Sequence, residues 1–578
     1  MLRAERAHPF GFIREFATRW DTLALIVVLA LVTFLAAVSH GLFAPLSQLD
    51  TSPMSLAPVH LPEYAARTTL RMFAALVLSL LFTLTYATWA AKSPRAGRVL
   101  VPLLDILQSV PILGFISITV VFFMALVPGR VLGAEFAAIF AIFTSQAWNM
   151  AFSFYQSLRT VPTELEEAAT SFHLTPWMRF WQLEVPFGLP ALTWNMMMSM
   201  SGGWFFVVAS ESISVGHTQV ALPGIGSYIA LAIEQRNLHA IGWAITAMAL
   251  VILVYDQLLF RPMIAWVDRF RVEQEPGAEP PTSWALSMMR HSRLIKGLTV
   301  TFNTVVRWTG RALPARAEPQ LTTNVRRLKN FWARDALWLT LLGVAGALVL
   351  RKLGQEVWKQ THLAELREVG FLGLLTMTRV LVLIALASLL WVPVGVWIGL
   401  RPRVAQWVQP VAQFLAAFPA NLLFPLAVYV IVTWRLSPNL WLSPLMILGT
   451  QWYILFNVIA GAAAMPSELR RAAENFHVGG WLWWRKVALP AIMPYFVTGA
   501  ITASGGSWNA AIVSELASWG NTQVSAQGLG AYIATATAAG DYHRIVLGIT
   551  TMCLFVVTIN RVFWRPLYYY AERHYRIS

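Results

Sequence analysis

Charged side chains are scarce in this sequence. Asp, Glu, Lys and Arg make up 12% of its 578 residues, 57% are hydrophobic, and the mean hydropathy is +0.58. A soluble domain cannot bury that much apolar surface, so lipid is expected to be the main solvent. The basic residues lie mostly in short stretches between apolar runs, a pattern of membrane topology rather than of a nucleic-acid-binding face. We therefore expect membrane lipid, and no nucleic acid, among the partners.

Cysteine is nearly absent, and the patterns of an enzyme are missing. The single Cys553 excludes an intrachain disulfide and a cysteine-based metal cluster, and the histidines show no metal-ligand spacing. No Gly-x-x-x-x-Gly-Lys-Ser/Thr phosphate loop occurs, so the chain lacks the cradle and the lysine that nucleotide phosphates require. No acid, base and nucleophile gather in a catalytic pattern. We expect no catalytic site, no metal and no cofactor in this chain.

What the sequence does contain is long apolar runs, each near the roughly 20 residues that a helix needs to cross a bilayer. The runs predict twelve crossings, six in each half: 22–43, 68–91, 100–127, 134–158, 183–210 and 238–262, then 336–352, 371–400, 404–435, 439–464, 487–515 and 543–565. With the N-terminus inside, the basic stretches fall on the cytoplasmic side, as the positive-inside rule requires. The first run is expected to remain as an anchor, and a cleaved signal peptide is the alternative.

These runs predict an all-α integral membrane protein. They divide the chain into a cytoplasmic N-terminal segment (1–21), a first transmembrane domain (22–263), a polar cytoplasmic linker (264–335), a second transmembrane domain (336–566) and a cytoplasmic tail (567–578). Both termini are therefore expected in the cytoplasm.

The two halves are copies of one another. Residues 162–190 align with residues 466–494 without a gap at a spacing of 304, and upstream the spacing is 308, as between Arg71 and Arg379. Fixed self-similarity of this kind indicates an internal duplication. Because an even number of crossings separates equivalent positions, both copies should have the same orientation, related by a pseudo-twofold axis along the membrane normal.

The best-matched segment begins with a short amphipathic helix. Leu165, Ala168, Ala169 and Phe172 recur at helical spacing, which predicts a helix near the start of residues 163–180. Thr163 with Glu166 predicts a capping box, and Ser467 predicts an N-cap in the second copy.

This segment resembles the EAA loop of ABC importer permeases. The resemblance lies in Glu167-Ala168-Ala169 followed by Leu183-Glu184-Val185-Pro186, and the second copy keeps both alanines but has Arg471 in place of the glutamate. Both copies carry a histidine, His173 and His477, where the family usually has glycine. The resemblance extends through nearly all of both halves.

A further pattern narrows the resemblance. Trp204, Ala209-Ser210-Glu211 and Pro223-Gly224-Ile225-Gly226 are similar to the nitrate, sulfonate and taurine branch of these permeases. A chain with two such copies resembles the duplicated permease components of anion transport systems.

The resemblance implies two tandem six-helix type I ABC permease domains in a bacterial inner membrane. It implies import of a small anion such as nitrate, sulfonate, taurine or bicarbonate, with ATP and Mg held by two separate ABC ATPase subunits and a periplasmic binding protein as a further partner. The loops would be the helices that dock on the ATPases, mainly through their shared apolar face. The residues implied in this coupling are Glu164, Leu165, Glu167, Ala168, Ala169, Phe172, His173, Glu468, Leu469, Arg471, Ala472, Ala473, Phe476 and His477.

Polar, aromatic and glycine residues of the fourth and fifth crossings are candidates for the substrate pathway, because small surfaces let helices approach and hydrogen-bond donors suit an oxyanion. They are Gln146, Trp148, Gly202, Gly203, Trp204, Ser210, Gln451, Trp452, Gly505, Gly506, Trp508, Asn509 and Ser514. Ordinary helix packing is the alternative for each of them.

Four charged residues converge on the outer side of the predicted bundle. We expect Arg71 to pair with Glu211 and Arg379 with Glu515, since an unpaired charge is costly there, and snorkelling of the arginines to the headgroups is the alternative.

Two other functions compete with an ABC permease. An ion-coupled secondary transporter can also have parallel six-plus-six repeats, but it needs intramembrane proton or sodium groups, and few candidates exist beyond Asp105. A membrane enzyme lacks a clustered catalytic set.

Overall fold

The computed structural model describes residues 54–109, 112–215, 218–267, 362–520 and 522–575, with a few isolated residues elsewhere. The expected first crossings of both halves, 22–43 and 336–352, lie outside these ranges apart from the isolated Arg351, and so does nearly all of the linker 264–335.

The described part of the first half is helical apart from one hairpin. Its elements are α4 (Leu61–Lys92), α5 (Pro94–Ser109), α6 (Ile112–Leu126), α7 (Val131–Arg159), α8 (Thr163–Ser171), α9 (Pro176–Arg179), α10 (Val185–Glu211), β1 (Ser212–Val215), β2 (Thr218–Ala221), α11 (Ile225–Glu234), α12 (Leu238–Tyr255) and α13 (Arg261–Val267). A π-helical turn, Phe180–Glu184, joins α9 to α10.

The second half repeats this order. Its elements are α17 (Leu363–Gly399), α18 (Pro402–Ala417), α19 (Phe424–Thr433), α20 (Pro438–Trp441), α21 (Ser443–Leu448), α22 (Gln451–Ala463), α23 (Ser467–Asn475), α24 (Gly480–Trp483), α25 (Leu489–Ser514), β3 (Leu516–Trp519), β4 (Thr522–Ser525), α26 (Leu529–Ala539), α27 (Tyr542–Ile559) and α28 (Arg565–Tyr575). The strands pair as two antiparallel hairpins, β1 with β2 and β3 with β4.

Six of the twelve predicted crossings appear as continuous long helices. Within the described residues, six continuous helices are long and apolar enough to span a bilayer: Pro58–Lys92, Val131–Arg159, Leu238–Val267, Leu363–Gly399, Gly480–Ser514 and Tyr542–Ala571. The sequence did not indicate the short helices α11 and α26 or the hairpins, which fill the loops after the fifth crossings.

Two predicted straight crossings of the second half are bent instead. α18 meets the stretch Ala420–Thr433 at 73°, because Phe418 precedes Pro419 and a residue before proline is driven out of helical geometry. The fourth crossing bends by 44° between α21 and α22, at Gly449. Its first-half counterpart α7 has Ser145 at this place and continues as one helix.

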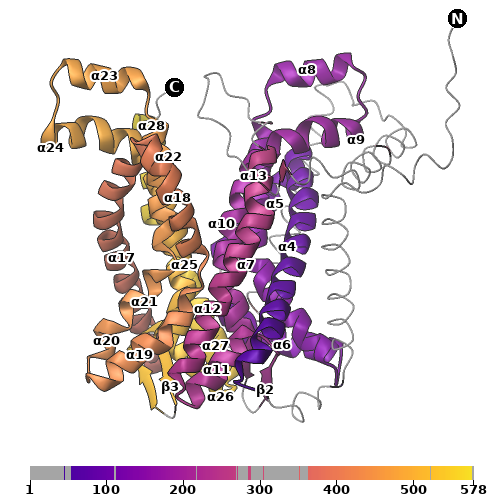
Figure 1. Ribbon diagram of the computed structural model, residues 1–578, viewed down its shortest axis with the longest axis vertical. Helices are drawn as coiled ribbons and strands as arrows, with labels where there is room; N and C mark the ends of the chain where they lie inside the picture. The colour runs from indigo at the N-terminus through magenta and orange to yellow at the C-terminus, as the bar shows by residue number, and fades with distance from the viewer. Residues whose placement is uncertain are drawn as a thin grey trace, which may run out of the picture.

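The two copies point the same way, as the duplication predicts. Figure 1 shows α8 and α23 at one end of the molecule, together with α28, and the hairpins with α11 and α26 at the other end. The fold therefore consists of two tandem helical copies in the same orientation.

Each half contributes its third crossing to the core of the other half. Leu422 and Phe424 belong to the same buried cluster as Trp204, and Leu113 belongs to the cluster around Trp508. Main-chain contacts reinforce the exchange, since Asn421 Nδ2 donates to the carbonyl oxygen of Phe205 at 3.1 Å. The halves cannot separate without exposing this apolar surface.

The packing of α17 on α22 generates a prediction. A Cβ at Gly399 would lie 2.6 Å from the carbonyl oxygen of Ile459 and 2.7 Å from the Cβ of Ala462, whereas a Cβ at Gly370 on the same helix would meet nothing within 4 Å. We expect Gly399→Ala to destabilise the protein by about 1–3 kcal/mol, the usual cost of overpacking. Gly370→Ala should be neutral or stabilising, since alanine is the better helix former by about 1 kcal/mol. Thermal unfolding of the purified protein checks the order, and equal midpoints for the two variants would contradict the close packing.

Candidate functional site

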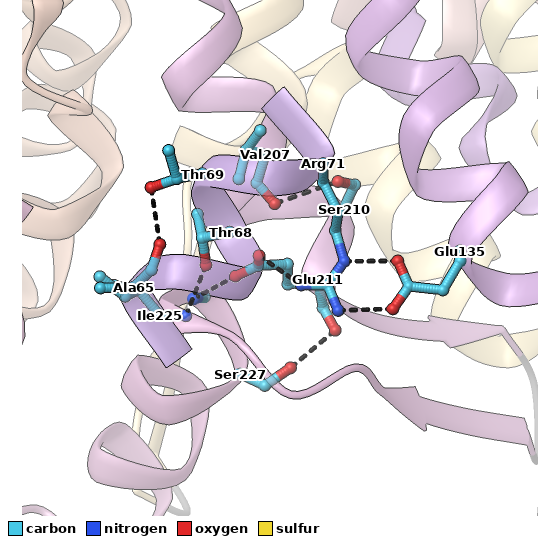
Figure 2. Close-up of polar contacts among 11 residues, drawn as sticks. Ala65, Thr68, Thr69, Arg71, Glu135, Val207, Ser210, Glu211, Ile225 and Ser227 are labelled. Carbon is cyan, nitrogen blue, oxygen red and sulfur yellow. Dashed lines mark hydrogen bonds and ion pairs between the residues drawn. The ribbon is translucent and has the colours of Figure 1, made fainter. Parts of the chain in front are cut away.

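A buried ion cluster lies at the hairpin end of the first half. The guanidinium of Arg71, on α4, contacts Glu135 on α7 through Nε and Nη2 at 2.6 and 2.7 Å, and its Nη1 lies 2.7 Å from Glu211 Oε1 at the end of α10 (Figure 2). All three side chains are buried, so Arg71 does not snorkel. The expected pair of Arg71 with Glu211 is thus present. Glu135 was not anticipated, although it is the only acidic residue of α7 and so an obvious partner for a buried cation.

Glu211 also fixes the start of α11. Its Oε2 accepts a hydrogen bond from the amide of Gly226 at 2.7 Å, and its carbonyl oxygen accepts from the hydroxyl of Ser227 at 2.6 Å (Figure 2). A carboxylate at a helix N-terminus satisfies free amides and complements the helix dipole. The Pro-Gly-x-Gly pattern follows from this close approach, since a Cβ at Gly224 would lie 2.3 Å from the Glu211 carboxyl carbon and one at Gly226 would lie 2.3 Å from the carbonyl oxygen of Val208.

The second half builds the same anchor. Arg379 Nη1 lies 2.9 Å from Glu515 Oε1, as expected from the sequence, and Glu515 Oε2 accepts from the amide of Gly530 at 2.7 Å. In each copy a threonine hydroxyl also accepts a hydrogen bond from the amide of the residue that precedes this glycine. Thr376 Oγ1 accepts from the amide of Leu529 at 2.9 Å, and Thr68 Oγ1 accepts from the amide of Ile225 at 3.0 Å.

The two clusters differ in charge. At the spacing of 304, Asn439 takes the place of Glu135, and its Oδ1 accepts from Arg379 Nη2 at 3.3 Å and from the amide of Gln527 at 2.7 Å. The first cluster holds one arginine and two carboxylates, and the second holds one arginine and one carboxylate.

At the opposite end, α8 and α23 each present an exposed aromatic side chain. Phe172 is 78% exposed and Phe476 is 80% exposed, and Trp177 and Trp481 are exposed nearby. Ala169 and Ala473 face the other way. Both alanines are buried against their own chain, and Ala473 packs with Met465 and Val487.

The structure divides the expected docking face. Ala169 and Ala473 are buried and Leu165 and Leu469 are half-buried, whereas Ala168, Phe172 and Phe476 are exposed. The outward surface consists of Phe172 and Phe476 with the other exposed residues of the coupling set: Glu164, Glu167, Ala168, His173, Glu468, Arg471 and His477, with Ala472 half-buried.

The predicted caps of these helices are wrong. The N-caps are Pro162 and Pro466, and neither helix start has a side-chain cap. Glu166 is drawn away from Thr163 because its Oε1 lies 2.5 Å from Nη2 of Arg179.

The C-terminal turns of α8 and α23 have the shape that a glycine would give. His173 has φ 51° and His477 has φ 53°, both in the left-handed region. The amide of the next residue reaches back over the helix end, from Leu174 to Ala169 and from Val478 to Ala473, which is the Schellman pattern. Histidine tolerates this conformation better than bulky residues do.

Most of the pathway candidates lie in helix packing. Five are fully buried: Gln146, Trp204, Ser210, Trp508 and Ser514. The ring of Trp204 lies 5.6 Å from that of Tyr255, and a Cβ at Gly203 would lie 2.6 Å from Met72 Cε. The remaining packed candidates are Trp148 against Phe82, Gln451 and Trp452 against Trp391, and Gly506 against Thr450.

Three candidates are placed differently. A Cβ at Gly202 would lie 3.2 Å from Tyr453 Oη in the other half, and a Cβ at Gly505 would meet nothing within 4 Å. Asn509 is half-buried, and its Nδ2 donates to the carbonyl oxygen of Gly505 at 3.2 Å.

A small hollow lies between the halves and was not anticipated. It is lined by Ser201 of α10, by Tyr255 and Asp256 at the end of α12, and by Gln413 and Phe414 of α18, among others. Asp256 Oδ2 lies 3.2 Å from Arg261 Nε. Within the described residues, no group of three or more His, Cys, Asp and Glu side chains is arranged to hold a metal ion.

Comparisons with known proteins agree with this geometry. The model of the family described as "Binding-protein-dependent transport system inner membrane component" matches residues 79–261 and again residues 391–576, more than half of the chain.

Curated relatives match shorter stretches. A glycine betaine/carnitine transport permease protein of Listeria monocytogenes is 25% identical over 32% of this chain and 59% of its own length, and a nitrate import permease protein of Leptolyngbya laminosa is 25% identical over 32% and 63%. A bicarbonate transport system permease protein of Synechococcus elongatus is 30% identical over 24% of this chain and 49% of its own length. The chain thus spans about half to six-tenths of the length of these relatives.

The ion clusters generate a prediction. Arg71→Met leaves two buried carboxylates without their cation, and we expect a loss of about 3–5 kcal/mol, typical of breaking a buried pair. Arg379→Met should cost less, because it strands one carboxylate and Arg379 is more exposed. Thermal unfolding of the purified variants measures the order.

Two controls sharpen this test. Arg67→Met removes a partly exposed pair with Glu63 one helical turn away and should cost only about 0.3–0.5 kcal/mol. Glu135→Asn gives the first cluster the composition of the second and should cost less than Arg71→Met. Equal midpoints for Arg71→Met and Arg67→Met would show that the cluster does not stabilise the bundle.

Proposed function

Because the chain belongs to the family of binding-protein-dependent transport system inner membrane components, we propose that it forms the translocation pathway of an ABC importer powered by separate ATPase subunits. The chain is a multi-pass membrane protein with the permease domain present twice. The observation that carries the proposal is the pair of loop helices, α8 and α23, which lie at the same end of the molecule (Figure 1). Each is followed directly by an exposed phenylalanine.

The two loop helices suit two ATPase subunits. Exposed aromatic side chains are typical anchors of interfaces, and burying one yields about 1.5–3 kcal/mol. Glu167 and Arg471 occupy matching positions with opposite charge, so two identical ATPases would bind mainly through the shared Phe172 and Phe476. Rim charges of this kind tune rate and specificity more than affinity.

The same assignment sets the membrane orientation. The ATPases and their ATP and Mg are cytoplasmic, so α8, α23 and the end of α28 would face the cytoplasm and the hairpins would face outward (Figure 1). The basic stretches between the apolar runs support this orientation. The family's description as an inner membrane component supports the inner membrane as the location. A periplasmic binding protein would deliver the substrate at the hairpin end.

The proposed substrate is a small anion. The relatives named for bicarbonate and nitrate support it, as does the resemblance to the nitrate, sulfonate and taurine branch. A betaine is the second candidate, because other relatives are named for glycine betaine and the inter-half hollow combines Tyr255 and Phe414 with the carboxylate of Asp256. Aromatic faces and a carboxylate attract a quaternary ammonium group.

The docking prediction concerns stoichiometry. When the chain is purified with its ATPase, each molecule of the chain should carry two ATPase subunits. The mass of the intact complex gives their number, and peptides that contain the phosphate loop identify them. Phe172→Asp or Phe476→Asp should each remove one subunit, and the double variant should remove both, because a charge cannot occupy an apolar groove. The matched control is Trp434→Asp, an exposed aromatic residue at the hairpin end. Unchanged stoichiometry in the double variant would refute docking at these residues.

The transport prediction separates the functions. In proteoliposomes with the ATPase and a binding protein, uptake of radiolabelled nitrate, bicarbonate or taurine should require ATP inside the compartment that holds the ATPase. Uptake driven by a proton or sodium gradient without ATP would establish the secondary transporter instead. Uptake of glycine betaine without uptake of any anion would replace the substrate class and leave the ABC mechanism intact.

A further inference from the structure

The loop helix α8 is held to the bundle by a chain of ion pairs. Lys92 Nζ, at the end of α4, lies 2.8 Å from Glu184 Oε2, and Arg179 Nε lies 3.3 Å from Glu184 Oε1. Arg179 also contacts Glu166 of α8 through Nη2 at 2.5 Å. Glu184 is the centre of this network because it alone contacts both cations, and its side chain is only 7% exposed.

The second half replaces this network residue by residue. The counterparts at the repeat spacings are Leu400 for Lys92, Trp483 for Arg179, Ala488 for Glu184 and Arg470 for Glu166. Leu400 and Trp483 pack with Met465 and Val487 in an apolar cluster that also contains Ala473 of α23. Ion pairs therefore support α8 in addition to the packing of Ala169, whereas apolar side chains occupy the matching positions beneath α23.

These two supports respond differently to salt. Lys92 and Glu166 are each 42% exposed, so counterions reach the network. Raising the salt concentration from about 0.1 M to about 1 M shortens the Debye length from about 10 Å to about 3 Å and weakens such pairs. An apolar cluster does not weaken under these conditions.

We propose that Glu184 is a positioning residue: it holds α8, and with it the docking surface at Phe172, through Lys92 and Arg179. Coupling through α8 therefore weakens as ionic strength rises, whereas coupling through α23 does not. The proposal rests on the proposed docking of ATPases at both loop helices. The two docking surfaces share their exposed aromatic residues, but under this proposal only the one at α8 is sensitive to salt.

The experiment isolates each surface in the intact complex. Phe476→Asp leaves α8 as the sole docking helix, and Phe172→Asp leaves α23. ATPase retention and transport-coupled ATP hydrolysis are measured in nanodiscs at both salt concentrations. We expect the α8-only complex to lose about twofold to fivefold at high salt, the factor that corresponds to a partly exposed ion pair. The α23-only complex should change little.

Variants in the α8-only complex test the residue itself. Glu184→Gln should reduce coupling at low salt and abolish the salt dependence. Glu474→Gln, the same change at an exposed glutamate of α23, which does not dock in this complex, should leave both unchanged. The triple variant Lys92→Leu, Arg179→Trp and Glu184→Ala copies the second support. It should couple better than Glu184→Gln at low salt and remain insensitive to salt.

Three outcomes would overturn the proposal: equal salt dependence of the two single-surface complexes, Glu184→Gln behaving like Glu474→Gln, or no recovery in a triple variant that folds with wild-type thermal stability. Loss of the ATPase from both single-surface complexes even at low salt would instead refute the docking sites, which distinguishes failure of the proposed function from failure of this inference.

Discussion

The rest of the structure depends on the placement of Glu211 and Glu515, two carboxylates buried in an apolar bundle. A charge in this setting must be paired and fully hydrogen-bonded. Each carboxylate is therefore bound by an arginine from the second crossing and by amides at the start of a short helix, α11 or α26. This arrangement joins three elements at one point in each half. It also dictates the glycines of the Pro-Gly-x-Gly pattern, because the backbone must approach the carboxylate too closely for any side chain.

The duplication kept this geometry and changed the charges around it. Asn439 replaces Glu135 beside the arginine, and Leu400, Trp483 and Ala488 replace the ion pairs beneath the loop helix. In both places the two halves have the same secondary structure, but a charged side chain of the first half is replaced by a neutral one in the second. Two fused copies can diverge in this way because each position is occupied only once in the assembled protein, whereas a homodimer would have to carry every change twice.

The sequence predicted the features that follow from topology and periodicity. Arg71 and Glu211 had to meet because both lie in apolar runs at the same end, and the repeat predicted Arg379 with Glu515. Features that depend on competition between nearby groups were missed. Glu166 was expected to cap α8 but contacts Arg179, and Ala169 was expected to face a partner but packs against its own chain. Periodicity identifies an apolar face without saying which apolar surface covers it. Trp204 and Trp508 illustrate the same point: both were candidates for the substrate pathway, and both are buried in hydrophobic clusters.

The exchange of third crossings constrains how the halves can move. Leu422 and Phe424 are packed in the core around Trp204, and Leu113 is packed around Trp508, so neither half has a core made only of its own residues. A rigid separation of the halves would break the packing of both clusters, and such packing contacts are what holds helices together in a membrane. The exchanged segments therefore join the two halves. The fifth crossing of the first half adds a close approach, because Gly202 on α10 faces Tyr453 of the other half without a side chain of its own.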